Sequence, residues 1–181
     1  KGTMREVQYD PNSGSDDQSG GGKAGSTKVS YIDEVEKTYG YLTGSYGIMN
    51  EHQLMCSECT DFAKMKADYS PGEPIFYSSE LSNIALERCT GAREAVEKVG
   101  ELIDRYGIYG TGETLIFADT REAWVLEMSS CTLDGCKGLW VAQRVPDGEV
   151  FVASNTFRIR KIDREDEVNM IFSDNLHDVA K

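Results

Sequence analysis

The clearest hydrophobic pattern in the sequence is an amphipathic repeat between residues 92 and 106. Its apolar positions recur every three or four residues and so share one side of a helix, while charged residues take the other side. The apolar set is Ala92, Ala95, Val96, Val99, Leu102, Ile103 and Tyr106. Thr90 is a candidate N-cap, and Gly107 is the residue type that commonly ends a helix. We therefore expect a helix that packs on a flat apolar surface.

A shorter helix is predicted immediately before this one. Its apolar positions follow the same spacing and are Leu81, Ile84, Ala85 and Cys89. Ser78 or Ser79 is expected to cap its N-terminus, because a serine hydroxyl can accept a hydrogen bond from the free N–H groups of the first turn.

Alternating patterns predict strands on both sides of the helices. Upstream, they cover residues 4–9, 27–32 and 38–42, and two further strands meet at the polar turn Asn50-Glu51-His52. Downstream, they cover residues 113–118, 123–128, 139–145 and 149–153, then a half-buried strand with Phe157, Ile159 and Ile162, and residues 168–180 read as an amphipathic helix. Pro146-Asp147-Gly148 predicts a hairpin turn between 139–145 and 149–153. This order predicts an α+β fold with helices on one face of a sheet.

Residues 1–181 read as a single domain or a large piece of one. Residues 11–26 are rich in Gly, Ser and Asp and predict a flexible loop. Gly20-Gly21-Gly22-Lys23 lacks the spacing of a phosphate-binding loop, and no helix pattern follows it. Gly110-Thr111-Gly112 is likewise better explained as a connection from helix to strand.

Composition narrows the classes of partner. The net charge is −12, so phosphate backbones would be repelled and nucleic-acid binding is not expected. The acidity is explained mainly by solubility, and the alternative is a field that favours cationic groups such as a substrate ammonium. No apolar run approaches the ~20 residues of a membrane span. The oligomeric state stays open, and a homo-oligomer is possible. The compartment also stays open, with cytoplasmic, secreted and lysosomal locations as alternatives.

Cysteine and histidine usage predicts neither a metal site nor a cofactor. Cys56 and Cys59 have the spacing CxxC, but no second pair or nearby His pair accompanies them. Cys131 and Cys136 flank a short loop and could form a disulfide in an oxidising compartment. The two histidines, His52 and His177, form no triad with a nucleophile, since four residues of strand separate His52 from Cys56 by ~13 Å.

Two strand ends carry candidate chemistry. Glu58 and Thr60 lie where the strand after the Asn50 turn ends, and they could bind a substrate ammonium and orient a carbonyl. Asn155 follows residues 150–153, and its side-chain amide could donate to a developing oxyanion. The alternatives are structural: Asn50 as a turn residue, Asn155 as an Asx turn, and Trp124 and Glu127 as parts of a strand with one face toward the core.

Several stretches resemble peptidase family C69, a family of dipeptidases that are N-terminal-nucleophile hydrolases. The likeness lies in three stretches: from Tyr46 to Thr60, in the helix pair from Tyr77 to Val96, and from Gly138 to Ile159. It runs from about Val29 to Asp163. It implies a four-layer αββα sandwich, a small peptide substrate and no cofactor. It also implies a role for Asn155 in the oxyanion or substrate site, with Glu58 and Thr60 lining the pocket.

The resemblance also implies a nucleophile that this stretch does not contain. Family members begin with a catalytic Cys, whereas this sequence begins with Lys1, so we expect the nucleophile upstream and the 181 residues alone to be inactive. In that chemistry the free α-amino group acts as the base, and its pKa of about 8 suits neutral pH. Two alternatives stay open: a non-catalytic interaction protein similar to secernins, and an acylase for non-peptide amides.

Overall fold

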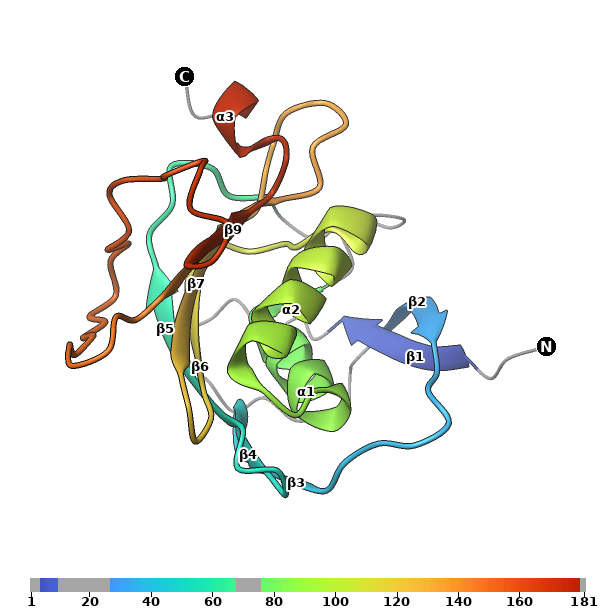
Figure 1. The fold of residues 1–181 in the computed structure, drawn as a ribbon. Coiled ribbons are helices and arrows are strands. Elements are labelled where there is room, and N and C mark those ends of the chain that lie inside the picture. The colour runs from blue at the N-terminus through green and yellow to red at the C-terminus, as the bar shows by residue number, and fades with distance from the viewer. Residues whose placement is uncertain (1–3, 10–26, 68–75, 180–181) are drawn as a thin grey trace.

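A computed structural model describes residues 4–9, 27–67 and 76–179 of the protein. Its main feature is a seven-stranded antiparallel sheet in which each strand pairs with the next along the chain, in the order β3-β4-β5-β6-β7-β8-β9 (Figure 1). The strands are β3 (Tyr41–Thr43), β4 (Gly47–Asn50), β5 (Met55–Asp61), β6 (Gly112–Ala118), β7 (Ala123–Ser129), β8 (Leu139–Arg144) and β9 (Met170–Phe172). The expected α+β fold is confirmed.

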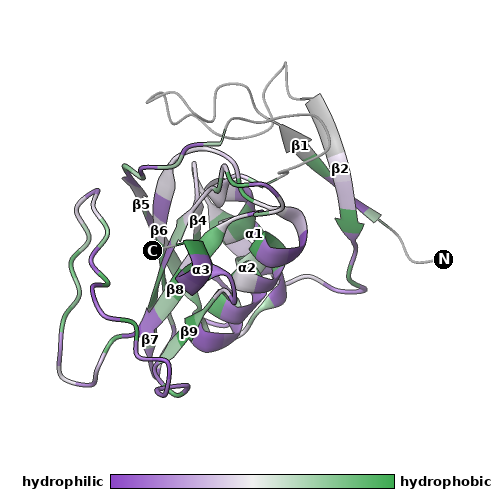
Figure 2. Ribbon diagram, turned by 90° about the horizontal axis from the view of Figure 1, so that it is seen from above, coloured by the Kyte–Doolittle hydropathy of each residue, from purple (hydrophilic) through white to green (hydrophobic). Residues whose placement is uncertain are grey.

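Two helices, α1 (Ser78–Arg88) and α2 (Ala92–Tyr106), cover one face of this sheet (Figure 1). Both carry hydrophilic and hydrophobic residues, as helices with a single buried side do (Figure 2). The apolar positions predicted for residues 92–103 are buried in the core against Leu115, Phe117, Leu126 and Trp124 of the central strands. We call this the helix face of the sheet, and the opposite side the far face.

A separate pair of strands, β1 (Met4–Tyr9) and β2 (Thr27–Asp33), lies beyond the helices on the side away from the sheet (Figure 1). Arg5 ties this pair to α1 through Glu80, at 2.8 Å, and through Glu87. The described residues thus form one large sheet, a helix pair and a small strand pair. The four-layer sandwich stays a prediction, and residues 11–26 lie outside the described residues.

The two helix starts differ from the prediction. Tyr77 and Gly91 occupy the N-cap positions, and neither side chain makes a capping hydrogen bond. Instead, the first-turn N–H of Ala92 donates to Oδ2 of Asp119 at 2.8 Å, from the turn between β6 and β7. A tertiary contact therefore takes over the role expected of Thr90, whose own N–H and hydroxyl bind Glu94. The predicted helix end at Gly107 is confirmed, with φ of 82°.

The segment after β8 was assigned wrongly. No strand forms at residues 149–153 or 157–162, although the turn at 146–149 is present, with Gly148 at φ of 82°. The open edge of β8 pairs with β9 instead, where Met170 lies opposite Gln143 and is buried. Val150 and Val152 are 89% and 68% exposed. The alternation of apolar and polar residues along this stretch therefore does not correspond to a strand with one buried face. Of the helix predicted at 168–180, only α3 (Leu176–Val179) forms.

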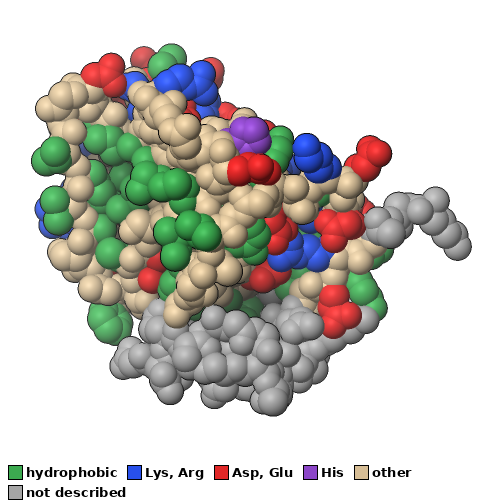
Figure 3. All heavy atoms as spheres, turned by 90° about the horizontal axis from the view of Figure 1, so that it is seen from below, with side chains coloured by type: hydrophobic (Ala, Val, Ile, Leu, Met, Phe, Trp, Pro, Cys, Tyr) green, Lys and Arg blue, Asp and Glu red, His purple; other side chains and the backbone are tan. Residues whose placement is uncertain are grey.

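The end of the sheet near β3 and β4 is less covered than its centre. Leu42, Ile48 and Met55, on the first three strands, are each about half exposed or more. Figure 3 views the molecule from this end and shows hydrophobic side chains gathered on part of its surface. Among the described residues, no helix has the length and apolar character needed to cross a bilayer.

Candidate functional site

Asn155 lies in a long loop, residues 145–169, that runs along the far face of the sheet (Figure 1). Its backbone is in the left-handed region, with φ of 52°, a conformation that Asn tolerates better than most residues. Its side-chain Nδ2 donates to the carbonyl oxygen of Thr60 at 2.8 Å, and its side chain is exposed. The structure therefore joins two of the predicted site residues, but through the backbone of Thr60.

Glu127 fixes the next part of this loop to the sheet. Its carboxylate accepts hydrogen bonds from the backbone N–H groups of Arg158 and Ile159, the latter at 3.1 Å. Glu127 is only 4% exposed, and this burial raises its pKa, while the two N–H donors act in the opposite direction. Glu127 thus has the structural role expected of it, and it positions the loop that carries Asn155.

Phe157 packs against the sheet at Gly112, the first residue of β6. A Cβ atom on Gly112 would lie 2.4 Å from Cζ of Phe157, so only glycine lets the ring approach this closely. The loop is therefore held at three successive points, by Asn155, by Phe157 and by the backbone of residues 158 and 159.

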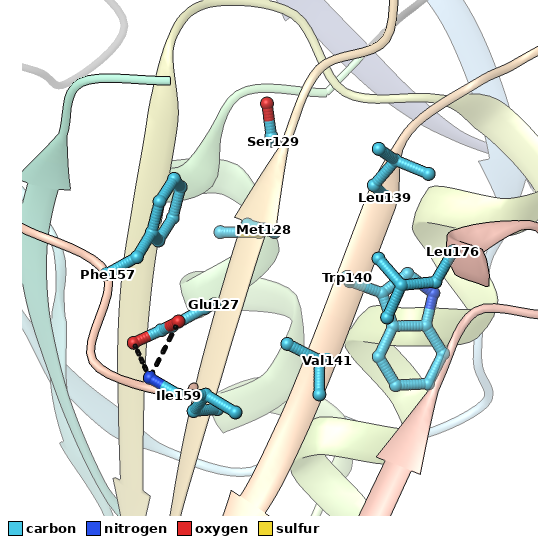
Figure 4. Close-up of a pocket in the computed structure, with 9 residues that line it drawn as sticks. All are labelled: Glu127, Met128, Ser129, Leu139, Trp140, Val141, Phe157, Ile159 and Leu176. Atoms are coloured by element: carbon cyan, nitrogen blue, oxygen red, sulfur yellow. Dashed lines mark hydrogen bonds between the residues drawn. The ribbon is translucent and has the colours of Figure 1, made fainter. Parts of the chain in front are cut away.

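A hollow of about 210 Å³ opens beside these contacts on the far face (Figure 4). Its floor is formed by strands β7 and β8, and its walls by the loop and by α3. The lining residues are mostly apolar and are Glu127, Met128, Ser129, Leu139, Trp140, Val141, Phe157, Ile159 and Leu176. Phe157 and Ile159 connect this hollow directly to the segment of Asn155.

The side chains of Glu58 and Thr60 point to the helix face rather than the far face. They alternate with Cys59 along β5, and they share their face with Cys56, which belongs to the core beneath the helices. Thr60 Oγ1 donates to Glu58 Oε1 at 2.9 Å. The structure therefore brings the side chains of Glu58 and Thr60 together, whereas the Asn155 side chain reaches the backbone carbonyl of Thr60. Their role in binding substrate stays a prediction.

Glu113 is the main feature of this region that the sequence did not reveal. It lies opposite Thr60 on β6, diagonal to Glu58, and is completely buried. The hydroxyl of Tyr77 donates to its Oε1 at 3.1 Å. Burial, and then the neighbouring Glu58 carboxylate, raise the pKa of Glu113 to about 10. Glu113 is therefore protonated and neutral at pH 7. Tyr77 is visible in the sequence, but its packing against Glu113 on β6 could not be predicted from the sequence.

Asp61 is a second buried acid, and it lies on the far face. It is 1% exposed, and its Oδ2 accepts a hydrogen bond from Thr114 Oγ1 at 2.5 Å. Its Oδ1 has no hydrogen-bond partner among the described residues. Burial raises the pKa of Asp61, and its charge contributes to the raised pKa of Glu127 on the same face. A carboxylate at the last position of β5, next to Thr60, was not singled out from sequence.

Two of the three free cysteines and both histidines of the described residues have structural surroundings. Cys56 and Cys89 are buried, which raises the pKa of both thiols, that of Cys89 to about 12. Both thiols are therefore neutral at pH 7 and poor nucleophiles. His52 packs edge-on against Tyr39, and His177 against Phe172.

Three other residues discussed from sequence have structural positions. Asn50 is buried, and its Nδ2 donates to the carbonyls of Leu86 and Cys89 at the end of α1, while its Oδ1 accepts from the N–H of Leu54 in the turn.

Cys131 and Cys136 are joined in a disulfide. Within the described residues, no cluster of three or more His, Cys, Asp or Glu side chains could hold a metal ion.

Sequence comparison identifies the class of protein to which this fold and loop belong. The sequence model of peptidase family C69 matches residues 48–181, and the chain belongs to that family. A probable dipeptidase of Salmonella dublin is 31% identical over 101 residues, which cover 56% of this chain and 22% of that protein. A probable dipeptidase B of Lactococcus lactis is 35% identical over 95 residues, covering 52% of this chain and 19% of that protein.

Dipeptidase A of Lactobacillus helveticus is 28% identical over 109 residues, covering 60% of this chain and 22% of that protein. The chain thus spans about a fifth of the length of these relatives. The matched family region includes Glu58, Thr60, Glu127 and Asn155.

Proposed function

We propose that the protein to which this chain belongs is a dipeptidase that hydrolyses the amide bond of small peptides. The proposal rests on membership of peptidase family C69 and on relatives named as dipeptidases. The nucleophile is the thiolate of a cysteine at the mature N-terminus, upstream of Lys1, and its own α-amino group is the base. The buried, neutral thiols of Cys56 and Cys89 are consistent with a nucleophile elsewhere.

Asn155 is the residue of this chain that stabilises the reaction's negative charge. The thiolate attacks the scissile carbonyl carbon, and the carbonyl oxygen becomes an oxyanion that needs hydrogen-bond donors. The Nδ2 group of Asn155 carries two hydrogens, and the hydrogen bond to Thr60 uses one of them. The second hydrogen is directed elsewhere and can donate to the oxyanion. The single observation that supports this role best is the anchored yet exposed amide of Asn155.

Anchoring matters because an oxyanion donor acts through its fixed position. A donor that is already oriented needs no reorganisation when charge develops, and one such donor contributes about 2.7–4 kcal/mol of transition-state stabilisation. The bond to Thr60 and the ties of Glu127 to the next residues supply that orientation.

The test is the replacement Asn155→Ala in the full-length protein. We expect kcat on dipeptides to fall by about 10²–10³-fold with little change in KM, because the lost donor acts mainly on the transition state. Asn169→Ala is the matched control, since the side-chain amide of Asn169 binds Asp166 within its own loop. Unchanged kcat/KM in Asn155→Ala would remove the assigned role. A wild-type protein that hydrolyses no dipeptide would remove the function itself.

A further inference from the structure

We propose that the apolar hollow on the far face is a subsite for one apolar side chain of the peptide substrate. This inference rests on the proposed dipeptidase function and adds the specificity of that same site. It is carried by the lining of the hollow, by its size and by its connection to Asn155.

The lining suits an uncharged side chain. Pairing of β7 with β8 sets Ser129 beside Leu139 and Glu127 beside Val141 on the floor, and Phe157, Ile159 and Leu176 close the sides. The carboxylate of Glu127 is already held by the N–H groups of Arg158 and Ile159. Figure 4 shows the bonds from Ile159. Among the described residues that line the hollow there is no Lys, Arg or His, so the lining itself offers no cationic partner to an acidic side chain.

The size suits a single side chain. The hollow measures about 210 Å³, the volume of roughly seven water molecules at ~30 Å³ each. Pockets for drug-sized ligands are larger, at about 300–1,000 Å³. A leucine, methionine or phenylalanine side chain is therefore a better fit than an extended ligand.

The connection to Asn155 places both parts within reach of one dipeptide. Asn155 and Ile159 are separated by four residues of chain, which span at most ~14 Å, and each is hydrogen-bonded to the sheet. A dipeptide covers about 7 Å of backbone, and its side chain extends the reach further. A carbonyl at Asn155 and a side chain in the hollow can thus belong to the same substrate.

The experiment fills the hollow in the full-length protein with Val141→Phe and compares a leucine-containing dipeptide with its alanine counterpart. Wild type is expected to prefer the leucine substrate by at least ~10-fold in kcat/KM, because one methylene in a fitted apolar pocket already discriminates 10–200-fold. Val141→Phe should remove this preference by slowing only the leucine substrate. Val150→Phe, the same change at a residue that is 89% exposed, should retain it.

A second variant and a second readout keep the test decisive. If Val141→Phe does not fold, Leu176→Ala enlarges the hollow and should shift the preference toward phenylalanine-containing dipeptides. Binding of free leucine to the wild type is measured separately by calorimetric titration. Dipeptide hydrolysis with the same leucine-to-alanine ratio in all folded variants would overturn the subsite alone. A wild type with neither hydrolysis nor a leucine response would overturn both the function and the subsite.

Discussion

At the scale of single residues, the exposed amide of Asn155 is held by the backbone carbonyl of Thr60, while the side chains of Glu58 and Thr60 bind each other. Asn155, Glu58 and Thr60 could be selected because polar residues at strand ends, supported by a family resemblance, mark a site. The face that a strand side chain takes depends on the register between strands, and that register places Glu58 and Thr60 toward the helices. Asn155 lies in a loop, and its amide reaches the backbone of Thr60. Glu113 escaped notice because its burial arises from packing against Tyr77, far away in sequence.

The neutral state of Glu113 leads to a prediction about stability and pH. The pKa of Glu113 in the folded protein, about 10, lies above the ordinary value of 4.5. The contribution of Glu113 to the free energy of unfolding is therefore fully present below pH 4.5, and it is lost progressively as the pH rises toward 10. Glu113→Gln keeps a neutral group that can accept from Tyr77. At pH 8 we expect it to stabilise the fold by at least ~1 kcal/mol, which corresponds to a rise of at least about 2–4 °C in Tm.

The measurement is thermal unfolding of wild type and Glu113→Gln between pH 4 and pH 9. The difference should be near zero at the acidic end and should grow with pH. Glu97→Gln, an exposed helix position, should shift Tm little at any pH. A Glu113→Gln protein that is less stable than wild type at pH 8 would show that Glu113 is ionised and favourably paired.

At the scale of elements, the periodic spacing of apolar residues correctly identified the long, regular helix and strands. The helix at residues 92–106 and the strands at 113–118 and 123–128 have the expected positions, because each has a face large enough to be buried. The stretch from 149 to 162 was misassigned because short alternating patterns also occur in loops that pack only a few side chains, such as Ile159 and Ile162, on a sheet. The predicted cap of α2 was wrong for a related reason, because the distant carboxylate of Asp119 took its place.

The contact of α2 with β8 depends on a glycine. A Cβ on Gly100 would lie 2.3 Å from Cζ2 of Trp140, and the indole N–H of Trp140 is held by Asp104 at 2.9 Å, so the ring has little freedom to move. Gly100→Ala improves helix propensity by about 1 kcal/mol, yet overpacking costs typically 1–3 kcal/mol, and we expect a net loss of stability.

Chemical denaturation of Gly100→Ala and of Gly44→Ala measures this effect. Gly44 is the control, because its nearest neighbour to a new Cβ is Ile48 at 3.8 Å, an ordinary contact. An unchanged or higher midpoint for Gly100→Ala would mean that α2 is not seated on Trp140 as described.

At the scale of the whole molecule, the order of strands, helices and strands was enough to predict a sheet with helices on one face. It could not predict the path of residues 145–169, because a loop of this length follows tertiary contacts rather than local preference. That loop carries Asn155 and closes the hollow, so the part of the site that matters most for function is the part that sequence pattern described least well.

The central claim is that this chain belongs to a dipeptidase with an N-terminal cysteine nucleophile. The most direct measurement is the intact mass and N-terminal sequence of the protein from its natural source, before and after treatment with a thiol-alkylating reagent. The account predicts a species longer than this chain that begins with Cys, and alkylation of that residue should abolish dipeptide hydrolysis. A protein that hydrolyses dipeptides without an N-terminal Cys, or that keeps its activity after that Cys is alkylated, would contradict it.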